Sequence, residues 1–344
     1  MAMNSPASYL LDPAMDAEEF LARYNNGQTN FCNANLAGMT LTGADLIGVE
    51  LRGASLQGVY FQFCHFGRAD LSHALLMGAC FEGCNFTQAV LSQSHFRDAV
   101  CHGCVFDRAN FQGAELTLAA FRDCNFLSSD LRQVNLSHTV LAGACLRGAN
   151  FRKENYQAPA NLVGVDLRYA DLQGTNLASA NLSRSSLMGA NLKEANLNDA
   201  NLSHANLENA NLQGAILSHA VLCEANLASA TLRQARLAKA DLRGGDLTQA
   251  DLSQAILVEA RLDEVQAQGA NLREAVLNKA DLRRANFSGA DLQEARLIDA
   301  YLARANLQGV NLRQANLIRA DISSALLLDA CMEEALMPDG SVYT

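Results

Sequence analysis

The most regular feature of the chain is a large apolar residue, leucine or phenylalanine, at every fifth position. The series begins at Phe31 and continues to Phe151. It shifts by one residue after Tyr156, resumes at Leu162 and runs with few exceptions to Met332. The residue two positions before each of these is small and is usually alanine. A repeat of five residues therefore organises almost the whole chain.

A period of five fits neither standard element of secondary structure. In an α-helix five residues advance by roughly 500°, so the leucines would point in every direction. In a flat strand an odd spacing would send alternate leucines to opposite faces. The pattern buries every leucine only when the backbone turns a corner after each five residues. This arrangement is typical of a solenoid.

A second period shows how many corners close one coil. Cysteine replaces the small inward residue at four positions spaced twenty apart, and phenylalanine occupies the large inward position that follows each of them. These cysteines are Cys64, Cys84, Cys104 and Cys124. Four sides of five residues therefore form one coil. Stacked coils that pair as parallel strands lie about 4.8 Å apart, so we expect about fifteen coils in a rod of roughly 70 Å.

The two ends and one break divide the predicted rod. Asp16-Ala17-Glu18-Glu19 resembles a capping box ahead of Phe20, Leu21 and Tyr24, and predicts a short amphipathic helix over the first coil. We expect an N-terminal segment with this helix over 1–30 and a Phe- and Cys-rich repeat block over 31–156. A one-residue frame slip over 157–161, a second repeat block over 162–335 and a C-terminal cap over 336–344 follow. The slip favours a bulged corner over a hinge between two rods.

The repeat unit itself carries a family resemblance. Its ideal form is Ala195-Asn196-Leu197-Asn198-Asp199, and copies follow at 200–202, 205–207 and 210–212. Over about residues 30–335 the sequence resembles the pentapeptide repeat family, and the segments 24–27 and 337–340 are similar to those of cyanobacterial members. The resemblance implies an all-β fold, a right-handed quadrilateral parallel β-helix. Some members of the family mimic DNA and bind DNA gyrase, whereas others act through protein partners.

Charge and composition limit the partners and the location. The formal net charge is −10, hydrophobic residues make up 49% of the chain and tryptophan is absent. Charge of both signs is spread evenly, so we expect no nucleic-acid partner. The stretch from Met1 to Asp16 lacks the features of a secretion signal, and no apolar run approaches the ~20 residues of a membrane helix. We therefore expect a cytoplasmic protein without a membrane span.

The residues that most invite a chemical function also fit the repeat. Cys101-His102-Gly103-Cys104 has a CxxC spacing, but Cys101 replaces an inward leucine and Cys104 an inward alanine, so both are expected to be buried hydrophobic residues. Ser-His pairs such as Ser203-His204 fall on solvated corners, where no third group or oxyanion donor can be oriented. We expect no enzyme activity, no cofactor and no metal.

Departures from the repeat point to partner-binding surfaces. The residue before each inward leucine points outward and is usually asparagine or aspartate, but five successive coils of the second block replace it. We expect these residues and their aliphatic neighbours to form one apolar and basic row on the fourth side. The row contains Ile216, Arg236, Ile256, Val258, Val276, Arg296 and Ile298, with Lys239 and Lys279 close by.

A similar departure marks the first side of the first block. There the outward position reads Thr40, Tyr60, Cys80, Val100, Ala120 and Val140, with Phe63 nearby. The frame places the two rows on adjacent sides. Exposed apolar strips often mark contacts with proteins, but β-branched residues also suit strands without any function. Three interpretations stay open: neutral drift, self-association as a homodimer, and binding of a protein of unknown identity.

Two functions are consistent with this pattern. A rigid rod that orders little on binding suits a non-enzymatic protein-interaction scaffold or regulator. The alternative is a DNA mimic that binds DNA gyrase or topoisomerase, which needs a continuous acidic side. The third side has some acidity, but Arg233, Arg273 and Arg313 interrupt it. Its acidic residues are Asp171, Asp251 and Asp291 with Glu194, Glu274, Glu294, Glu333 and Glu334. The scaffold is therefore the favoured hypothesis.

Overall fold

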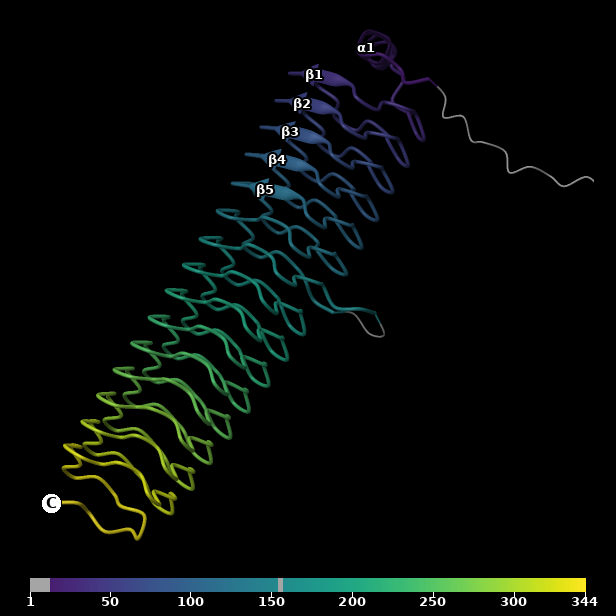
Figure 1. Ribbon diagram of the computed structural model, residues 1–344. Helices are drawn as coiled ribbons and strands as arrows, with labels where there is room; N and C mark the ends of the chain where they lie inside the picture. The colour runs from purple at the N-terminus through teal and green to yellow at the C-terminus, as the bar shows by residue number, and fades with distance from the viewer. Residues whose placement is uncertain (1–12, 154–156) are drawn as a thin grey trace, which may run out of the picture.

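A computed structural model of the chain describes residues 13–153 and 157–344. They form a long parallel β-solenoid of stacked coils, with one short helix at the N-terminal end (Figure 1). The predicted four-sided parallel β-helix is confirmed. The predicted N-terminal segment falls partly on residues 1–12, which lie outside the described residues, as do residues 154–156 at the end of the predicted first repeat block.

Backbone pairing defines four sides of the rod. In each block an outward residue pairs in parallel with the residue twenty positions later, so every side is a continuous row of outward residues. We name the sides by the first coil: side A from Asn30, side B from Asn35, side C from Thr40 and side D from Asp45. Along the chain the sides follow one another in this order. Sides A and C are therefore opposite, as are sides B and D.

Regular strands occur only on side C of the first block, as far as the structure describes the chain. They pair in parallel in the order β1-β2-β3-β4-β5, each in register with the strand twenty residues on. The strands are β1 (Thr40–Thr42), β2 (Tyr60–Gln62), β3 (Cys80–Glu82), β4 (Val100–His102) and β5 (Ala120–Arg122). Elsewhere single bridges connect successive coils. Side C thus presents a flat parallel sheet in its first half.

The corners explain why asparagine and aspartate recur at the outward position. A typical corner is a β-turn in which the Ala200 N–H donates to the Leu197 carbonyl at 3.1 Å, with Asp199 at φ 56°. The outward residue stabilises the next corner with its side chain. The Ser203 N–H, for example, donates to Asn201 Oδ1 at 3.0 Å. Each outward Asn or Asp thereby satisfies a backbone N–H that the coil leaves free.

The core is filled by the large and small inward residues that the repeat predicts. In the first block phenylalanine rings stack in a column, with ring centroids 4.9 Å apart for Phe66 and Phe86, 5.0 Å for Phe86 and Phe106, and 4.9 Å for Phe106 and Phe126. The second block uses leucine almost throughout, and Phe287 is its buried aromatic residue. Both blocks bury these side chains almost completely. A single narrow hydrophobic core therefore runs along the rod.

The break in the repeat is a six-residue insertion into one coil. Across it, Asn135 pairs with Asn161 and Asn150 with Asn176, a spacing of 26 residues instead of twenty. In Figure 1 the described chain just before and just after residues 154–156 extends sideways from the rod. The reading frame slips by only one residue because the other five equal one whole repeat. Pairing continues on all four sides. A one-residue slip predicts that 161 continues the side of 140, but in the structure 161 pairs with 135 and 166 pairs with 140. Each side of the second block is therefore displaced by one side from its predicted place.

Helix α1 (Ala17–Asn25) covers the N-terminal end of the rod, as predicted. Asp16 is its N-cap and accepts a hydrogen bond from the Glu19 N–H at 2.8 Å. Phe20 is buried against Phe31, with ring centroids 4.6 Å apart. No helix in residues 13–153 and 157–344 is long and apolar enough to cross a lipid bilayer.

The C-terminal residues fold back on one side of the last coil. Leu336 pairs antiparallel with Val342, and the Tyr343 N–H donates to the Ala335 carbonyl at 2.8 Å. The tail therefore covers side A of this coil. Sides B, C and D of the coil have no further coil upon them within the described chain.

We predict that Phe106→Ala lowers the free energy of unfolding by about 3–5 kcal/mol, because it removes the middle ring of the column and leaves a cavity between two coils. Chemical denaturation followed by circular dichroism measures the change. Phe106→Leu, which restores the side chain used in the second block, should recover most of the loss. Equal stability of Phe106→Ala and the wild type would contradict a core built on this column.

Candidate functional site

The ordinary surface of the rod consists of hydrogen-bonded asparagine and aspartate rows. On side D, Asn191 Nδ2 donates to Asp171 Oδ1 at 2.9 Å, and Asn311 Nδ2 donates to Asp291 Oδ1 at 2.8 Å. Each of these side chains also accepts a hydrogen bond from a backbone N–H of its own corner. The Gln293 N–H, for example, donates to Asp291 Oδ1 at 3.0 Å. Such rows leave few free polar groups for a partner. A row that loses its Asn and Asp residues therefore differs chemically from the rest.

The predicted row of the second block lies on side A, where the structure brings its members together. Ile216, Arg236, Ile256, Val276 and Arg296 pair in succession along five coils. Ile256 is 37% exposed, and the other aliphatic members are half-buried. Two more predicted residues, Val258 and Ile298, follow on the neighbouring corners. We call these seven residues the side A row.

The side A row leaves backbone donors open at its corners. Without an outward Asn or Asp, four corner N–H groups have no hydrogen-bond acceptor among the described residues. They belong to Ser218, Ala238, Val258 and Asn278. The fifth corner differs, because the Ile298 N–H donates to Asn278 Oδ1 at 3.1 Å. Four amide donors thus face outward beside aliphatic side chains, and a free N–H requires water or a ligand as its partner.

Cationic side chains flank these donors. Arg236 and Arg296 form no ion pair with any residue of the described chain, whereas Lys279 lies near Asp299 and helps to lower the pKa of that carboxyl. Lys239, in contrast, pairs with Glu259 at 3.7 Å. The side A row therefore combines apolar area, unused amide donors and unpaired positive charge.

The predicted row of the first block lies on side C, over the sheet β1–β5. Tyr60 is 38% exposed and Val100 is 48% exposed, whereas Val140 is half-buried. Phe63 stands at a corner with φ 51°, and its ring lies over Gly83 of the next coil. A Cβ on Gly83 would approach the ring to 2.7 Å, so glycine is needed for this position of the phenylalanine. We call Tyr60, Phe63, Val100 and Val140 the side C row.

The side C row is the centre of a larger apolar surface that sequence reasoning missed in part. Ahead of the last coil, half of the large hydrophobic side chains that are exposed lie on side C or its two corners. They are Tyr60, Phe63, Met77, Val100, Leu118 and Tyr169. The ring of Tyr169 lies over Gly189, in the same way as the ring of Phe63 lies over Gly83. A long apolar residue at a corner, with glycine one coil later, is the signal that could have found it.

The expectation that the two rows occupy adjacent sides is wrong. Val140 pairs with Asp166, so side C of the first block continues into 166, 186 and 206. Asn176, which begins the predicted row of the second block, pairs with Asn150 on side A. The six-residue insertion advances the chain by one side more than the one-residue slip that the sequence frame predicts. The two rows therefore lie on opposite sides of the rod.

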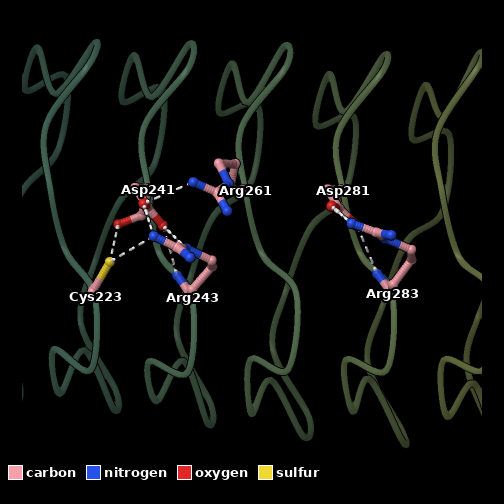
Figure 2. Close-up of polar contacts among 6 residues, drawn as sticks. All are labelled: Cys223, Asp241, Arg243, Arg261, Asp281 and Arg283. Carbon is pink, nitrogen blue, oxygen red and sulfur yellow. Dashed lines mark hydrogen bonds and ion pairs between the residues drawn. The ribbon is translucent and has the colours of Figure 1, made fainter.

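A charged ladder on side B is the feature that sequence reasoning did not find (Figure 2). Arg243 binds Asp241 through two hydrogen bonds, Nε to Oδ1 at 2.8 Å and Nη2 to Oδ2 at 2.7 Å. Arg261 of the next coil adds a contact of 3.3 Å to the same carboxylate. Arg283 binds Asp281 in the same manner. The signal is the tripeptide Asp-Leu-Arg at the outward position, which places both charges on one surface.

A shallow depression lies at the C-terminal part of this ladder. It has a volume of about 440 Å³ and is lined mainly by acidic and basic side chains, with Arg284 Nη1 3.1 Å from Glu264 Oε1. The lining residues are Asp263, Glu264, Arg283, Arg284, Ala303, Arg304 and Ser323. The two acidic residues lie in one coil, and the three arginines lie in the next two coils. Arg284 is therefore paired with Glu264 across the stack.

Comparison with known proteins identifies the repeat. The family described as Pentapeptide repeats matches residues 27–93 and 160–337 in overlapping copies, and the one described as Pentapeptide repeat region matches 74–151. The chain belongs to the pentapeptide repeat family. No curated protein matches the sequence.

Solved structures with similarity to this pentapeptide repeat protein include two from cyanobacteria. HetL from Nostoc sp. Strain PCC 7120, a protein involved in heterocyst differentiation regulation, is 29% identical, with 96% of this chain and 100% of that chain covered and a TM-score of 0.30. Rfr23 from Cyanothece 51142 is 29% identical over 32% of this chain and 64% of that chain, with a TM-score of 0.18. QnrB1, a plasmid-mediated fluoroquinolone resistance protein, is 22% identical over 61% and 88%, with a TM-score of 0.31.

The acidic residues on side D of this pentapeptide repeat protein do not form a continuous acidic strip. Asp251 accepts a hydrogen bond from Asn271 Nδ2 at 3.0 Å. Arg273 lies 3.1 Å from Glu294, and Arg313 pairs with Glu333 in the last coils. The acidic groups are thus engaged by neighbouring amides and arginines.

Titration of the ladder and of the core thiols follows from these contacts. The hydrogen bonds from Arg283 hold the pKa of Asp281 below its usual value. In the core, burial raises the pKa of Cys101 well above its usual value, and the neighbouring Cys104 thiol raises that of Cys84 to about 12. Among the described residues no group of three or more His, Cys, Asp or Glu side chains is placed to hold a metal ion.

We predict that the stabilisation from the Asp281–Arg283 pair disappears in acid. Because the folded-state pKa of Asp281 is lowered, its contribution is present above the unfolded pKa of about 3.9 and is lost as the pH falls through the folded pKa. Asp281→Asn keeps an acceptor for the corner N–H and removes only the charge. It should destabilise the rod by less than about 1 kcal/mol at pH 7. Urea denaturation at pH 7 and pH 3 measures the difference in unfolding free energy between Asp281→Asn and the wild type. This difference should be smaller at pH 3 than at pH 7, and an equal difference at both would contradict the ion-pair assignment.

We also predict that thiol reactivity separates core from surface cysteines. Cys64, Cys84, Cys101, Cys104 and Cys124 are buried, whereas Cys331 is exposed. At neutral pH a maleimide should modify Cys331 quickly and the five core thiols only after unfolding, because burial keeps the reagent from all five. In Cys64, Cys84 and Cys101 a raised pKa also depletes the reactive thiolate. Mass spectrometry of labelled peptides measures this order. Early labelling of Cys84 or Cys104 in the folded protein would contradict the packing described here.

Proposed function

We propose that this protein is a non-enzymatic interaction scaffold that binds a protein partner through the side A row. One observation carries the proposal: in five successive coils the row lacks the Asn or Asp that stabilises most corners of the rod, and four amide N–H groups face outward unused. An Asn at these positions would satisfy the donors within the rod. The rod instead keeps aliphatic and basic residues there.

The chemistry of the row favours an acidic partner with apolar anchors. Ile256 and its aliphatic neighbours supply apolar area, and Arg236 and Arg296 supply positive charge without an internal ion pair. The open N–H groups favour carbonyl or carboxylate oxygens of the partner. A solenoid stiffened by pairing along its whole length has little to order on binding, so it loses little entropy. These features together support binding of an acidic protein surface or segment.

The side C row supports a second contact on the opposite side of the rod. Phe63 and Val100 are more exposed than any aliphatic member of the side A row, and Tyr60 and Val100 lie on the sheet β1–β5. Because the two rows face away from each other, one flat partner cannot cover both. Two partners can therefore bind at the same time. A protein that holds two partners together acts as a scaffold, whereas a protein with one binding surface does not.

We predict that restoring asparagine to the side A row removes partner binding while the rod keeps its stability. The variant Ile216→Asn, Ile256→Asn and Val276→Asn introduces the residue that other coils carry at this position, so each change can gain a corner hydrogen bond worth about 1 kcal/mol. Chemical crosslinking in a lysate of the source organism, followed by mass spectrometry, identifies partners of the wild type. The same partners should be absent from the variant, whose unfolding midpoint should stay equal or rise.

A matched variant on the other side serves as the control. Tyr60→Thr with Val100→Thr places in the side C row the residue that Thr40 supplies to the same sheet. It should keep the side A partners and lose only those of side C. Identical partners for the wild type and the asparagine variant would refute a function for the side A row. Crosslinking of DNA gyrase to both the wild type and the asparagine variant would instead favour the DNA-mimic hypothesis. If the wild type sediments as a dimer and the asparagine variant as a monomer, the row serves self-association.

A further inference from the structure

Side C of the first block offers side chains to a partner, and its backbone groups are already used. Strands β2, β3 and β4 are paired in register on both edges, so their N–H and carbonyl groups bond within the sheet. On this side and its corners Phe63, Val100 and Leu118 are each about half exposed. Sheets with apolar faces pack on one another about 10 Å apart. The side therefore suits a second flat, apolar surface.

The apolar side chains of this side are arranged evenly about the coil of Val100. At the corner between sides B and C, Met77 stands one coil before Val100 and Leu118 one coil after it, and both are exposed. Two coils away along side C itself are Tyr60 and Val140. The surface before Val100 thus resembles the surface after it.

The charges at the opposite corner, between sides C and D, are opposite in sign at equal distances from the same coil. Glu82 lies one coil before His102, and Arg122 lies one coil after it. Glu82 accepts a hydrogen bond from Gln62 Nε2 at 2.6 Å but has no ion pair within the described chain. Arg122 likewise has no ion pair there, although it lies near enough to Asp166 to help lower the pKa of that carboxyl. One acidic and one basic group are therefore available at matched positions.

A two-fold axis relates these two halves. If the axis passes through the coil of Val100, perpendicular to the rod and in the plane of contact, a second copy lies antiparallel on side C and like corners meet. Glu82 of each copy then faces Arg122 of the other, and Met77 faces Leu118. A parallel copy instead brings Met77 beside Glu82 and Leu118 beside Arg122, which sets apolar groups against charges. Such a self-complementary contact is the form that two-fold dimers take.

Charged groups close to this axis have partners of opposite sign in their own chain. Arg97 Nε lies 3.4 Å from Asp98 Oδ2, and His102 Nδ1 lies 3.8 Å from Asp123 Oδ2. When each of these groups meets its own copy across the axis, the neighbouring carboxylate offsets the like charge. The middle of the contact therefore carries no uncompensated positive charge.

The described chain leaves side C clear for a second copy. The six-residue insertion lies between Asn150 on side A and Asn161 on side B, so it leaves the rod at the corner diagonally opposite the corner of sides C and D. In Figure 1 the strands β1–β5 and the inserted segment lie on different sides of the rod. The insertion therefore does not prevent two rods from lying face to face.

We propose that two copies of this protein form an antiparallel dimer through side C, with the two-fold axis at Val100. The contact extends over the seven coils from Thr40 to Asp166, a length of roughly 30 Å. The side A rows of both copies then face outward on the far sides of the dimer. The proposal names the occupant of side C and does not depend on the partner proposed for side A.

Sedimentation equilibrium of the full chain over a range of concentrations tests for the dimer. Val100→Lys places two lysines at the axis and should raise the dissociation constant by about 100-fold or more, because like charges in a contact cost several kcal/mol. Val221→Lys makes the same change at an exposed outward valine of side B and should dimerise as the wild type does. Equal unfolding midpoints verify that both variants fold.

Charge reversal tests the antiparallel arrangement. Glu82→Arg or Arg122→Glu alone creates two like-charge contacts in each dimer and should raise the dissociation constant by about tenfold at low salt. An equal mixture of the two variants should form a mixed dimer as tightly as the wild type, because every contact between positions 82 and 122 again joins opposite charges. Glu208→Arg changes the same corner two coils beyond the contact and should have no effect.

Four results would overturn the proposal. A wild type that is monomeric at every concentration has no such dimer, and a dimer that Val100→Lys leaves intact uses another surface. A mixture that associates no more tightly than its two components would exclude the antiparallel arrangement. A monomer whose side C crosslinks to a different protein would give the row a heterologous partner instead. None of these results changes the expected crosslinks of the side A row, so the two proposals fail separately.

Discussion

The structure depends on one repeated interaction, the hydrogen bond between the N–H of each inward residue and the outward carbonyl of the next coil. The Leu197 N–H, for example, donates to the Ile216 carbonyl at 2.7 Å. This bond fixes the distance between coils, and it holds inward residues above inward residues. The leucine and phenylalanine columns follow from it, because only a fixed register stacks like upon like. The same register turns every outward position into a straight row.

The fold therefore places few constraints on which residues occupy the outward rows. The one task that the fold gives them is to supply an acceptor for the next corner, and Asn or Asp performs it on most coils, as Asn201 does for Ser203. Where this task is abandoned, on side A from Ile216 to Arg296, the cost in hydrogen bonds is small and the change in surface chemistry is large. Binding surfaces can form on such a rod without disturbing its core. This separation explains how one fold presents several different faces.

The sequence predicted the fold almost completely, because the period of five and the superperiod of twenty leave one backbone arrangement that buries every leucine. It also predicted which residues share a row. It did not predict which rows face each other, because a frame slip of one residue looks the same as an insertion of six. Nor did it predict the ladder of Asp241 and Arg243, whose partners lie two positions apart on a corner that periodicity treats as solvent. Contacts between side chains on corners depend on rotamers that a repeat frame does not contain.

The six-residue insertion before Ala160 fixes the angle between the two rows that we propose as binding surfaces. Its length determines which side of the first block each side of the second block continues. A loop shorter by one pentapeptide would rotate the second sequence block by a quarter turn and bring the two rows onto neighbouring sides, while every coil kept the same hydrogen bonds. Under the proposed function, loop length sets the direction in which one bound protein faces another. The angle between the rows can change in steps of ninety degrees, by gain or loss of single repeats, without any change in the residues of the rows.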